Sequence, residues 1–374
     1  MTIYEELGVT RVINASGPFT RVGGSLMPSE VLAAMAEASR AFVSIDRLLQ
    51  KAGEHIAELI GVEAGFITSG AAAGLAVATA ACMAGEDPTR AVQLPDTTGL
   101  RDEVIMLRSH RIQYDQVIRV AGARVVDVGF TDFTPRDHLQ AAITDRTAAV
   151  VYVAKREPVS GSLPLEQVVD AAHGADVPVI VDAADELPPV SNLRSFLDRG
   201  ADLAVFSGGK DISGPQSSGL VLGRRDFIRA CAVHACPNHG IGRAMKAGKE
   251  EIAGLLKAVE LYVEQDFDEE MKHWEEQRDY LVSELSHLPD VRVGVYKALP
   301  GEPGSFYLPA AHVALDEEEL GTTQEEVVQE LWAGNPAIAV DSRPTGIVLH
   351  AQMLKQGEEK AIVSQLRRIL GRGQ

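Results

Sequence analysis

Three short segments of the chain combine residue types that could carry out amine chemistry at one site. Lys210 ends the segment 206–210, Phe-Ser-Gly-Gly-Lys, in which a glycine turn follows an apolar run. Asp182 directly follows the apolar residues 179–181, and small residues fill 68–74 between a strand pattern and a helical pattern. A lysine amine can bond covalently to a carbonyl group, a carboxylate can pair with a cation, and the first N–H groups of a helix bind anions. We therefore expect these segments to carry the chemistry of the protein.

Each segment also has an ordinary interpretation when it is taken alone. The segment 68–74 is equally typical of a tight strand-to-helix turn, Asp182 of a magnesium ligand or a helix cap, and Lys210 of a surface loop. Together they match the needs of one cofactor, pyridoxal 5′-phosphate (PLP). These needs are a site for the phosphate, a carboxylate that keeps the pyridine nitrogen protonated, and a lysine that forms an imine. The combination predicts a PLP enzyme in which Lys210 carries the cofactor as a Schiff base.

The elements predicted around these segments would bring them to one edge of a sheet. Between residues 64 and 223, short apolar runs alternate with helical patterns. Strands that are apolar on both faces and separated by helices are typical of a mostly parallel sheet covered on both sides, and ligands bind at the carboxyl ends of such strands. The expected strands are 65–68, 104–107, 125–128, 148–153, 179–181, 203–206 and 220–222, and the expected helices are 71–84, 114–121, 135–143, 164–175 and 193–199.

The flanking regions predict two further parts. Residues 1–45 are expected to form an N-terminal arm and a first helix, with Ser29 as its N-cap, ahead of a large α/β domain over 46–245. Residues 246–374 mix helical and strand patterns and predict a small C-terminal α+β domain. The expected helices of these regions are 29–42, 48–60, 249–288, 323–332 and 358–370, and the expected strands are 291–295, 312–315, 338–340 and 347–350.

The composition narrows the range of partners. The 374 residues include 35 Lys+Arg and 53 Asp+Glu, a net charge of −18, which disfavours nucleic acid and anionic membranes as partners. The N-terminus has no signal-peptide pattern and no apolar stretch is long enough to span a bilayer, so we expect a soluble cytoplasmic protein. The three cysteines lack framework spacing. The segment 231–236, Cys-Ala-Val-His-Ala-Cys, leaves a metal site open, but helix packing is the favoured interpretation and we expect no metal.

Several stretches carry a resemblance to a known family. The chain resembles fold-type-I PLP enzymes of the aspartate-aminotransferase-like fold. More narrowly, it is similar to the group that contains L-seryl-tRNA(Sec) selenium transferase and the D-glucosaminate-6-phosphate ammonia-lyases. The matching stretches run in order over about two-thirds of the chain: 12–17 with 23–25, 62–74, 119–123, 180–186 and 206–219.

The resemblance implies roles for the cofactor-binding residues. Lys210 would be the Schiff-base lysine and proton shuttle, and Asp182 would pair with the pyridinium nitrogen. His110 could stack on the cofactor ring. The cofactor phosphate would be held by Ser69, Gly70 and Ala71, with help from Ser207.

It also implies candidates for substrate binding. Arg108 or Arg111 could bind a substrate anion, although a solvated basic loop is an equally good interpretation of both. Arg343 lies where this superfamily often binds the substrate carboxylate. Gln216 follows Lys210 in a stretch expected at the interface of a homodimer, together with residues 14–24, where the partner subunit usually completes the site. Asp185 departs from the small apolar residue expected there, and it is either a substrate contact or an outward-pointing side chain.

The predicted reaction is the α,β-elimination and deamination of a small polar or phosphorylated hydroxyamino acid or amino sugar acid. The products would be a 2-keto acid and ammonia. An aminotransferase, racemase or aldolase acting on a similar substrate, or a non-catalytic relative that binds PLP or a sugar phosphate, stays open as an alternative. Selenium transfer to seryl-tRNA is disfavoured by the charge of −18 and because the tRNA-binding region of those enzymes is expected to be missing here.

Overall fold

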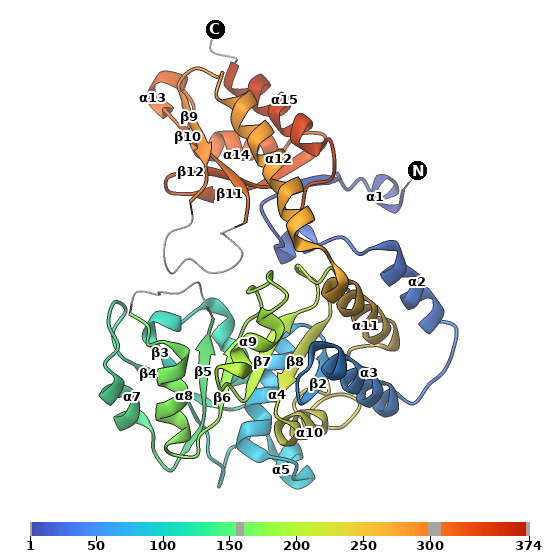
Figure 1. Ribbon diagram of the computed structural model, residues 1–374, viewed down its shortest axis with the longest axis vertical. Coiled ribbons are helices and arrows are strands. Elements are labelled where there is room, and N and C mark those ends of the chain that lie inside the picture. Colours follow the sequence, from blue (N-terminus) through green and yellow to red (C-terminus); the bar gives the residue numbers. More distant parts are fainter. Residues whose placement is uncertain (1, 155–160, 298–307, 372–374) are drawn as a thin grey trace. The chain divides into compact units, whose positions relative to one another are not determined.

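The computed structural model describes residues 2–154, 161–297 and 308–371. The chain forms two compact units (Figure 1). Among the described residues, the larger unit spans 27–154 and 161–265, and the smaller unit combines 2–26 with 266–297 and 308–371.

The larger unit is built on a seven-stranded sheet. Strand β8 is antiparallel to both of its neighbours, and all other neighbours in the sheet are parallel. This confirms the predicted α/β class with a mostly parallel sheet. In spatial order the strands are β2 (Ala64–Thr68), β8 (Gly219–Gly223), β7 (Leu203–Ser207), β6 (Val179–Asp182), β5 (Thr147–Val153), β3 (Glu103–Leu107) and β4 (Arg124–Val128).

Helix α4 (Ala71–Ala84) is the central helix of this unit. It contacts strands β2 and β5 to β8, and nearly all of its side chains are buried. Its alanines and glycine allow this close approach: a Cβ on Gly74 would lie 2.7 Å from Cγ1 of Val205 and 3.1 Å from Cγ2 of Val221. The tight packing fixes the start of α4 against the ends of the central strands.

The other helices of this unit form three groups. Helices α5 (Pro88–Gln93), α6 (Gln116–Val120) and α10 (Arg225–His234) pack beside α4, while α7 (Arg136–Ala142), α8 (Leu165–His173) and α9 (Asn192–Asp198) lie over the opposite face of the sheet (Figure 1). Helix α11 (Lys249–Glu264) packs on α2 (Ser29–Ala38) and α3 (Ile45–Ile60), and α3 contacts the edge strand β2.

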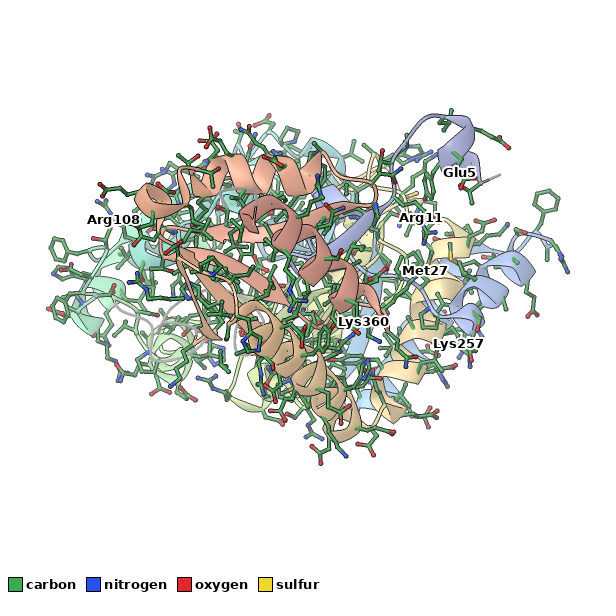
Figure 2. The ribbon with its side chains drawn as sticks, turned by 90° about the horizontal axis from the view of Figure 1, so that it is seen from above. Glu5, Arg11, Met27, Arg108, Lys257 and Lys360 are labelled. Atoms are coloured by element: carbon green, nitrogen blue, oxygen red, sulfur yellow. The ribbon has the colours of Figure 1, made fainter. Side chains whose placement is uncertain are left out.

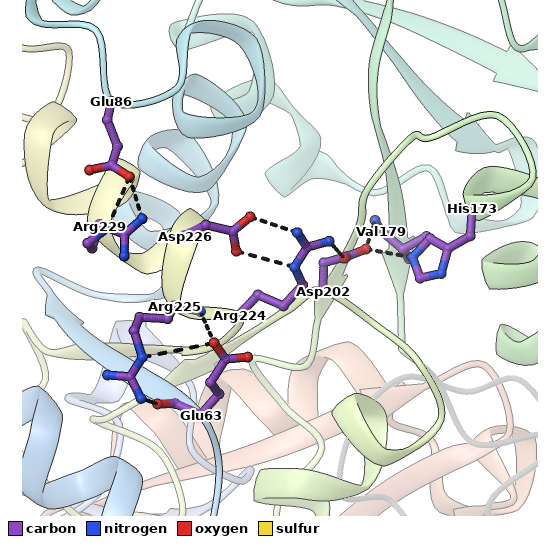
Figure 3. Close-up of polar contacts among 9 residues, drawn as sticks. All are labelled: Glu63, Glu86, His173, Val179, Asp202, Arg224, Arg225, Asp226 and Arg229. Carbon is purple, nitrogen blue, oxygen red and sulfur yellow. Dashed lines mark hydrogen bonds and ion pairs between the residues drawn. The ribbon is translucent and has the colours of Figure 1, made fainter.

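A buried carboxylate stabilises the sheet edge at which the parallel strands begin. Asp202 is 2% exposed and precedes β7. Its carboxylate accepts hydrogen bonds from the Val179 backbone N–H at 2.8 Å, from Nη1 of Arg224 at 2.8 Å and from Nε2 of His173 at 2.9 Å (Figure 3). One side chain thus joins α8, the start of β6 and the segment after β8.

The smaller unit contains a five-stranded sheet packed against three helices. Helices α12 (Phe267–Leu285), α14 (Gln324–Trp332) and α15 (Glu358–Leu370) bury its apolar side chains in one core, which includes Leu281, Leu331, Leu349 and Leu366. Short helices α1 (Ile3–Glu6) and α13 (Glu317–Leu320) complete it. The strand order is β1 (Val12–Ala15), β11 (Ala337–Arg343), β12 (Gly346–His350), β10 (Ala310–Leu315) and β9 (Val291–Val295).

The two units differ from the predicted division at 45/46 and 245/246. Residues before 27 join the smaller unit because β1 pairs in parallel with β11, with Val12 opposite Ala337. Residues 27–45 and 246–265 join the larger unit because α2 and α11 pack on each other. Both differences come from contacts between segments more than 200 residues apart, which local patterns do not show.

Individual elements differ in smaller ways. Ser29 is the first helical residue of α2 rather than its N-cap, a position held by Pro28, and the helix ends at Ala38 instead of 42. The helix expected over 114–121 begins at Gln116 after a single 3₁₀ turn. Strand β1 and helices α1, α5 and α13 were not predicted, and α10 was anticipated only through the helix-packing interpretation of the segment 231–236.

Candidate active site

The topology of the larger sheet brings three of the predicted segments to one edge. Strand β8 is antiparallel to β2 on one side and to β7 on the other, so β2 and β7 run in the same direction, as does β6. Thr68 at the end of β2 and Ser207 at the end of β7 both pair with Gly219. Asp182, at the end of β6, pairs with Val205. The residues that follow these strand ends therefore share one edge of the sheet.

The start of α4 forms a backbone cradle at this edge. Gly70 precedes the helix with a φ of +94°, which favours glycine, and its carbonyl accepts a 2.9 Å hydrogen bond from Oγ1 of Thr68. A Cβ on Gly219 would lie only 2.3 Å from the carbonyl carbon of Gly70, so the two backbones touch. Ser69 and Gly70 are half-buried, and Ala71 opens a 14-residue helix whose first N–H groups lack helical acceptors. This cradle suits an anionic group.

Lys210 lies in the loop after β7 and reaches toward the loop after β6. Its Nζ forms an ion pair with Oδ1 of Asp185 at 2.9 Å, and the two side chains are 27% and 31% exposed. Gly208 and Gly209 allow this turn because their neighbours leave no room for side chains: a Cβ on Gly209 would lie 2.4 Å from Cα of Gln216. Asp185, which the sequence left between a substrate contact and an outward position, is thus the ion-pair partner of Lys210.

Asp182 is a buried carboxyl group beside this pair. It is 7% exposed, and its Oδ1 accepts a hydrogen bond from the Ala184 N–H at 3.2 Å. Burial raises the pKa of Asp182 above its usual range, against the opposing effects of that hydrogen bond and of the Lys210 charge. A carboxyl group in this state would be stabilised in its ionised form by a bound cationic N–H, which is what a protonated pyridine ring offers.

Asp211 is a site residue that the sequence analysis did not single out. Its Oδ2 is buried, and burial followed by the charge of Asp185 raises the pKa of Asp211 to about 8, while the charge of Lys210 opposes this rise. The signal in the sequence was an acidic residue directly after the candidate lysine. Its burial, however, depends on packing that the sequence does not reveal.

His110 lies deeper than the prediction of ring stacking requires. It is 0% exposed, its Nδ1 accepts from the Val153 N–H at 3.2 Å, and its Nε2 lies 2.7 Å from Oγ of Ser162. Its ring also meets that of Tyr152 edge-on, with centroids 4.5 Å apart. Since no face of the imidazole is exposed, stacking on a cofactor would require the ring or its neighbours to move.

The two arginines near His110 have different surroundings. Arg111 forms ion pairs with Asp115 and Asp127. Arg108, labelled in Figure 2, is exposed. It forms no ion pair with any residue that the structure describes. Ion pairs thus engage Arg111 but not Arg108 among the described residues, and binding of a substrate anion by either arginine stays a prediction.

Gln216 and Ser207 are two further residues predicted at the site. Gln216 is exposed on the segment that packs over Gly209, and Ser207 is half-buried at the end of β7. Ser207 thus ends the strand that precedes Lys210, and Gln216 lies in the segment that follows Lys210.

Arg343 belongs to the smaller unit, where it is part of a buried polar group. Its Nε donates to Oδ2 of Asp341 at 2.9 Å, and Nε2 of His350 lies 3.2 Å from the same oxygen. Burial acts to raise the pKa of Asp341, but the hydrogen bond of His350 and the charges of His350 and Arg343 bring it below its usual range. Binding of a substrate carboxylate by Arg343 stays a prediction.

Over residues 2–154, 161–297 and 308–371, no three His, Cys, Asp or Glu side chains gather as metal ligands, and no helix there is long and apolar enough to cross a bilayer. Cys231 is buried on α10, as the helix-packing interpretation of that segment expects.

Comparison with known proteins identifies the family. The family model of L-seryl-tRNA selenium transferase matches residues 12–273. D-glucosaminate-6-phosphate ammonia lyase of Salmonella typhimurium is 34% identical over 98% of this chain and 97% of its own length. A solved structure of D-glucosaminate-6-phosphate ammonia-lyase, also 34% identical, has a TM-score of 0.86 and covers 99% of this chain and 98% of that one.

Two further proteins widen the comparison. A 5′-C-glycyluridine monooxygenase-decarboxylase of a Streptomyces species is 35% identical over 90% of this chain and 83% of its own length. Serine palmitoyltransferase from S. paucimobilis, solved with a PLP adduct, shares the fold at a TM-score of 0.61 and 14% identity, covering 97% of this chain and 88% of that one. The chain therefore belongs to the L-seryl-tRNA selenium transferase family and has the fold of fold-type-I PLP enzymes, as its sequence predicted.

Proposed function

We propose that the chain is a PLP-dependent ammonia-lyase that acts on a small polar or phosphorylated hydroxyamino acid or amino sugar acid. One observation carries the proposal: Lys210, Asp182 and the start of α4 follow strand ends at one edge of a sheet. The 34% identity with an ammonia lyase over nearly the whole of both chains supports the reaction class.

The residues present fit PLP. Lys210 would hold the aldehyde carbon, Asp182 the ring nitrogen, and Ser69, Gly70 and Ala71 at the start of α4 the phosphate. When bound, PLP supplies an aldehyde that forms imines with amines and a protonated ring that withdraws electrons from the substrate Cα. Asp182 serves this chemistry because its ionised form holds the ring nitrogen in the protonated state.

Lys210 is the group placed to move protons in the reaction. Its Nζ, once free of the cofactor, would accept the proton of the substrate Cα. The β-hydroxyl would leave as water after taking one proton. Water then replaces the amine nitrogen, so the balance is one hydroxyamino acid converted into one 2-keto acid and one ammonia, with no oxidant consumed.

Arg108 is the candidate for the anionic group of the substrate. It is exposed and directly follows β3, and Asp115 and Asp127 engage its neighbour Arg111. A guanidinium binds carboxylate or phosphate oxygens in a bidentate manner. A phosphorylated or polar acid therefore suits this site better than an apolar amino acid.

A second candidate function is oxidative decarboxylation of an amino acid. It is favoured by the 35% identity with a 5′-C-glycyluridine monooxygenase-decarboxylase. The cofactor-binding residues would be the same in both reactions, but the second reaction would consume O₂ and release CO₂. Measurements of O₂ consumption and CO₂ release therefore distinguish the two candidate reactions.

The test is a product analysis with the PLP-loaded protein. Hydroxyamino acids and amino sugar acids, each with and without a phosphate, are supplied under air and under argon, with Lys210→Ala as the inactive control. We expect equal amounts of ammonia and 2-keto acid under both gases. Keto acid that appears only with an added amino acceptor would identify an aminotransferase, and CO₂ release that needs O₂ would identify the second candidate.

We also infer that the chain forms a homodimer or a higher homo-oligomer. Large apolar side chains near the N-terminus are exposed in the single chain, among them Leu32 at 50%, Phe42 at 103% and Val43 at 51%. Such exposure is typical of surfaces that another chain covers. Light scattering coupled to size-exclusion chromatography should give at least twice the 40.0 kDa mass of one chain. A monomer would contradict the inference.

A further inference from the structure

Asp185 has no part in the set of residues that PLP requires, yet its carboxylate is the ion-pair partner of Lys210. The Nζ–Oδ1 distance of 2.9 Å is that of a charge-assisted hydrogen bond. Asp185 lies three residues after Asp182, in the loop that leaves β6, so its backbone is fixed by the same strand end. The contact therefore joins the loops after two neighbouring strands.

Two other carboxyl groups lie near Lys210, and neither matches Asp185 as a counter-ion. Burial raises the pKa of Asp182, and it raises the pKa of Asp211 to about 8, so ionisation of either group is less favourable than ionisation of an exposed carboxyl group. Asp182 would also be occupied by the cofactor ring under the proposed function. Asp185 is half-exposed and makes the ion pair that the structure records.

Lys210 needs such a partner at one stage of the reaction. A lysine side chain has four rotatable bonds, and its amine loses its fixed position when the covalent bond to the cofactor is broken. At that stage Nζ must lie where it can take the Cα proton. A single charge-assisted hydrogen bond to a carboxylate on a fixed loop restricts the amine to one region.

We propose that Asp185 is a positioning residue for Lys210, whose carboxylate holds Nζ at the sheet edge whenever the amine is not bonded to the cofactor. In the lyase reaction, on which this proposal rests, Nζ takes one proton from the substrate Cα and becomes an ammonium. Asp185 stabilises that ammonium until the proton passes to the departing hydroxyl oxygen, which leaves as water.

The first test uses the cofactor-free protein and is independent of any reaction. Lys210 is acetylated with trace acetic anhydride at pH 7.5, and the modified fraction is measured by peptide mass spectrometry. Because the ion pair with Asp185 holds Nζ against the carboxylate and away from the reagent, its loss in Asp185→Asn should raise the rate at Lys210 by about fivefold. Asp185→Glu should stay close to the wild-type rate.

The matched control is Asp198→Asn, which removes the carboxylate of an exposed pair with Arg194 in the same unit. It should leave Lys210 acetylation unchanged, and circular dichroism should show that all variants are folded. Equal acetylation of Lys210 in the wild type and Asp185→Asn would overturn the proposal.

The second test uses the PLP-loaded protein. Asp185→Asn should lower kcat by about ten- to a hundredfold with KM changed less than threefold, and Asp185→Glu should recover part of the loss. Unchanged kcat in Asp185→Asn would also overturn the proposal. If the wild type forms no ammonia with any substrate while acetylation responds as expected, the lyase function fails and the contact between Asp185 and Lys210 stands.

Discussion

Replacing Asp182 by asparagine separates the chemical role of this carboxyl group from its structural role. Asparagine has nearly the same shape, and its Oδ1 can still accept the 3.2 Å hydrogen bond from the Ala184 N–H. It cannot carry the negative charge that a protonated ring nitrogen requires. The substitution therefore removes one charge–charge interaction at a site that is 7% exposed and leaves the packing in place.

The magnitude follows from the burial of the site. A charge-assisted hydrogen bond contributes about 1.5–3 kcal/mol, and the larger value suits a buried carboxylate. At 1.36 kcal/mol per factor of ten, Asp182→Asn should lower kcat and the affinity for PLP by about a hundredfold each.

Whereas Asp182→Asn should lower kcat and PLP affinity, it should not lower the stability of the cofactor-free protein. Because burial raises the pKa of Asp182, the ionised carboxylate is unfavourable in the cofactor-free fold, and its contribution to stability is lost as pH rises through the folded-state pKa. The neutral asparagine avoids this loss, so the cofactor-free variant should have an equal or higher Tm at pH 8.

The assays are titration of PLP by absorbance, steady-state ammonia release and differential scanning fluorimetry of the cofactor-free protein. Wild-type PLP affinity together with wild-type kcat in Asp182→Asn would refute the reasoning. A large fall in the cofactor-free Tm would show instead that the side chain acts through the fold.

Three further changes test other parts of the structure. Because the pKa of Asp211 is raised from 3.8 to about 8, the free energy of unfolding of the cofactor-free wild type should fall as pH rises from about 4 to 8. In Asp211→Asn this fall, measured by urea unfolding, should be smaller. An equal pH dependence in the variant and the wild type would contradict this expectation. Asp202→Ala leaves the buried Val179 N–H without its acceptor and should lower the free energy of unfolding by about 2–3 kcal/mol, measured by urea unfolding, with PLP affinity unchanged. Gly219→Ala places a Cβ 2.3 Å from the Gly70 carbonyl carbon and should displace the backbone cradle at the start of α4. PLP binding, measured by equilibrium titration, should therefore weaken at least tenfold. An unchanged affinity would mean that the phosphate binds elsewhere.

The sequence predicted those parts of the site that depend on local pattern and on general sheet topology. Lys210 and Asp182 each follow an apolar run, and parallel strands end at the same edge, so their proximity follows once the runs are assigned as strands. The helix of small residues from Ala71 to Ala84 was predicted to the residue, because its composition and its terminal Gly85 are local signals.

The remaining features depend on partners that are distant in sequence. The ion pair of Arg111 with Asp127 requires the parallel pairing of β3 and β4, and the burial of His110 requires the loop that carries Ser162. The pairing of β1 with β11 joins residues more than 300 positions apart. Periodicity in one sequence carries no information on such pairs, which explains both the missed β1 and the different domain boundaries.

The central claim is that Lys210 bonds covalently to PLP, and one measurement tests it most directly. The PLP-loaded protein is reduced with borohydride, digested and mapped by mass spectrometry. The account predicts a pyridoxyl phosphate group on Nζ of Lys210 and on no other lysine. Tightly bound PLP that reduction leaves unattached, or attaches to a different lysine, would contradict it.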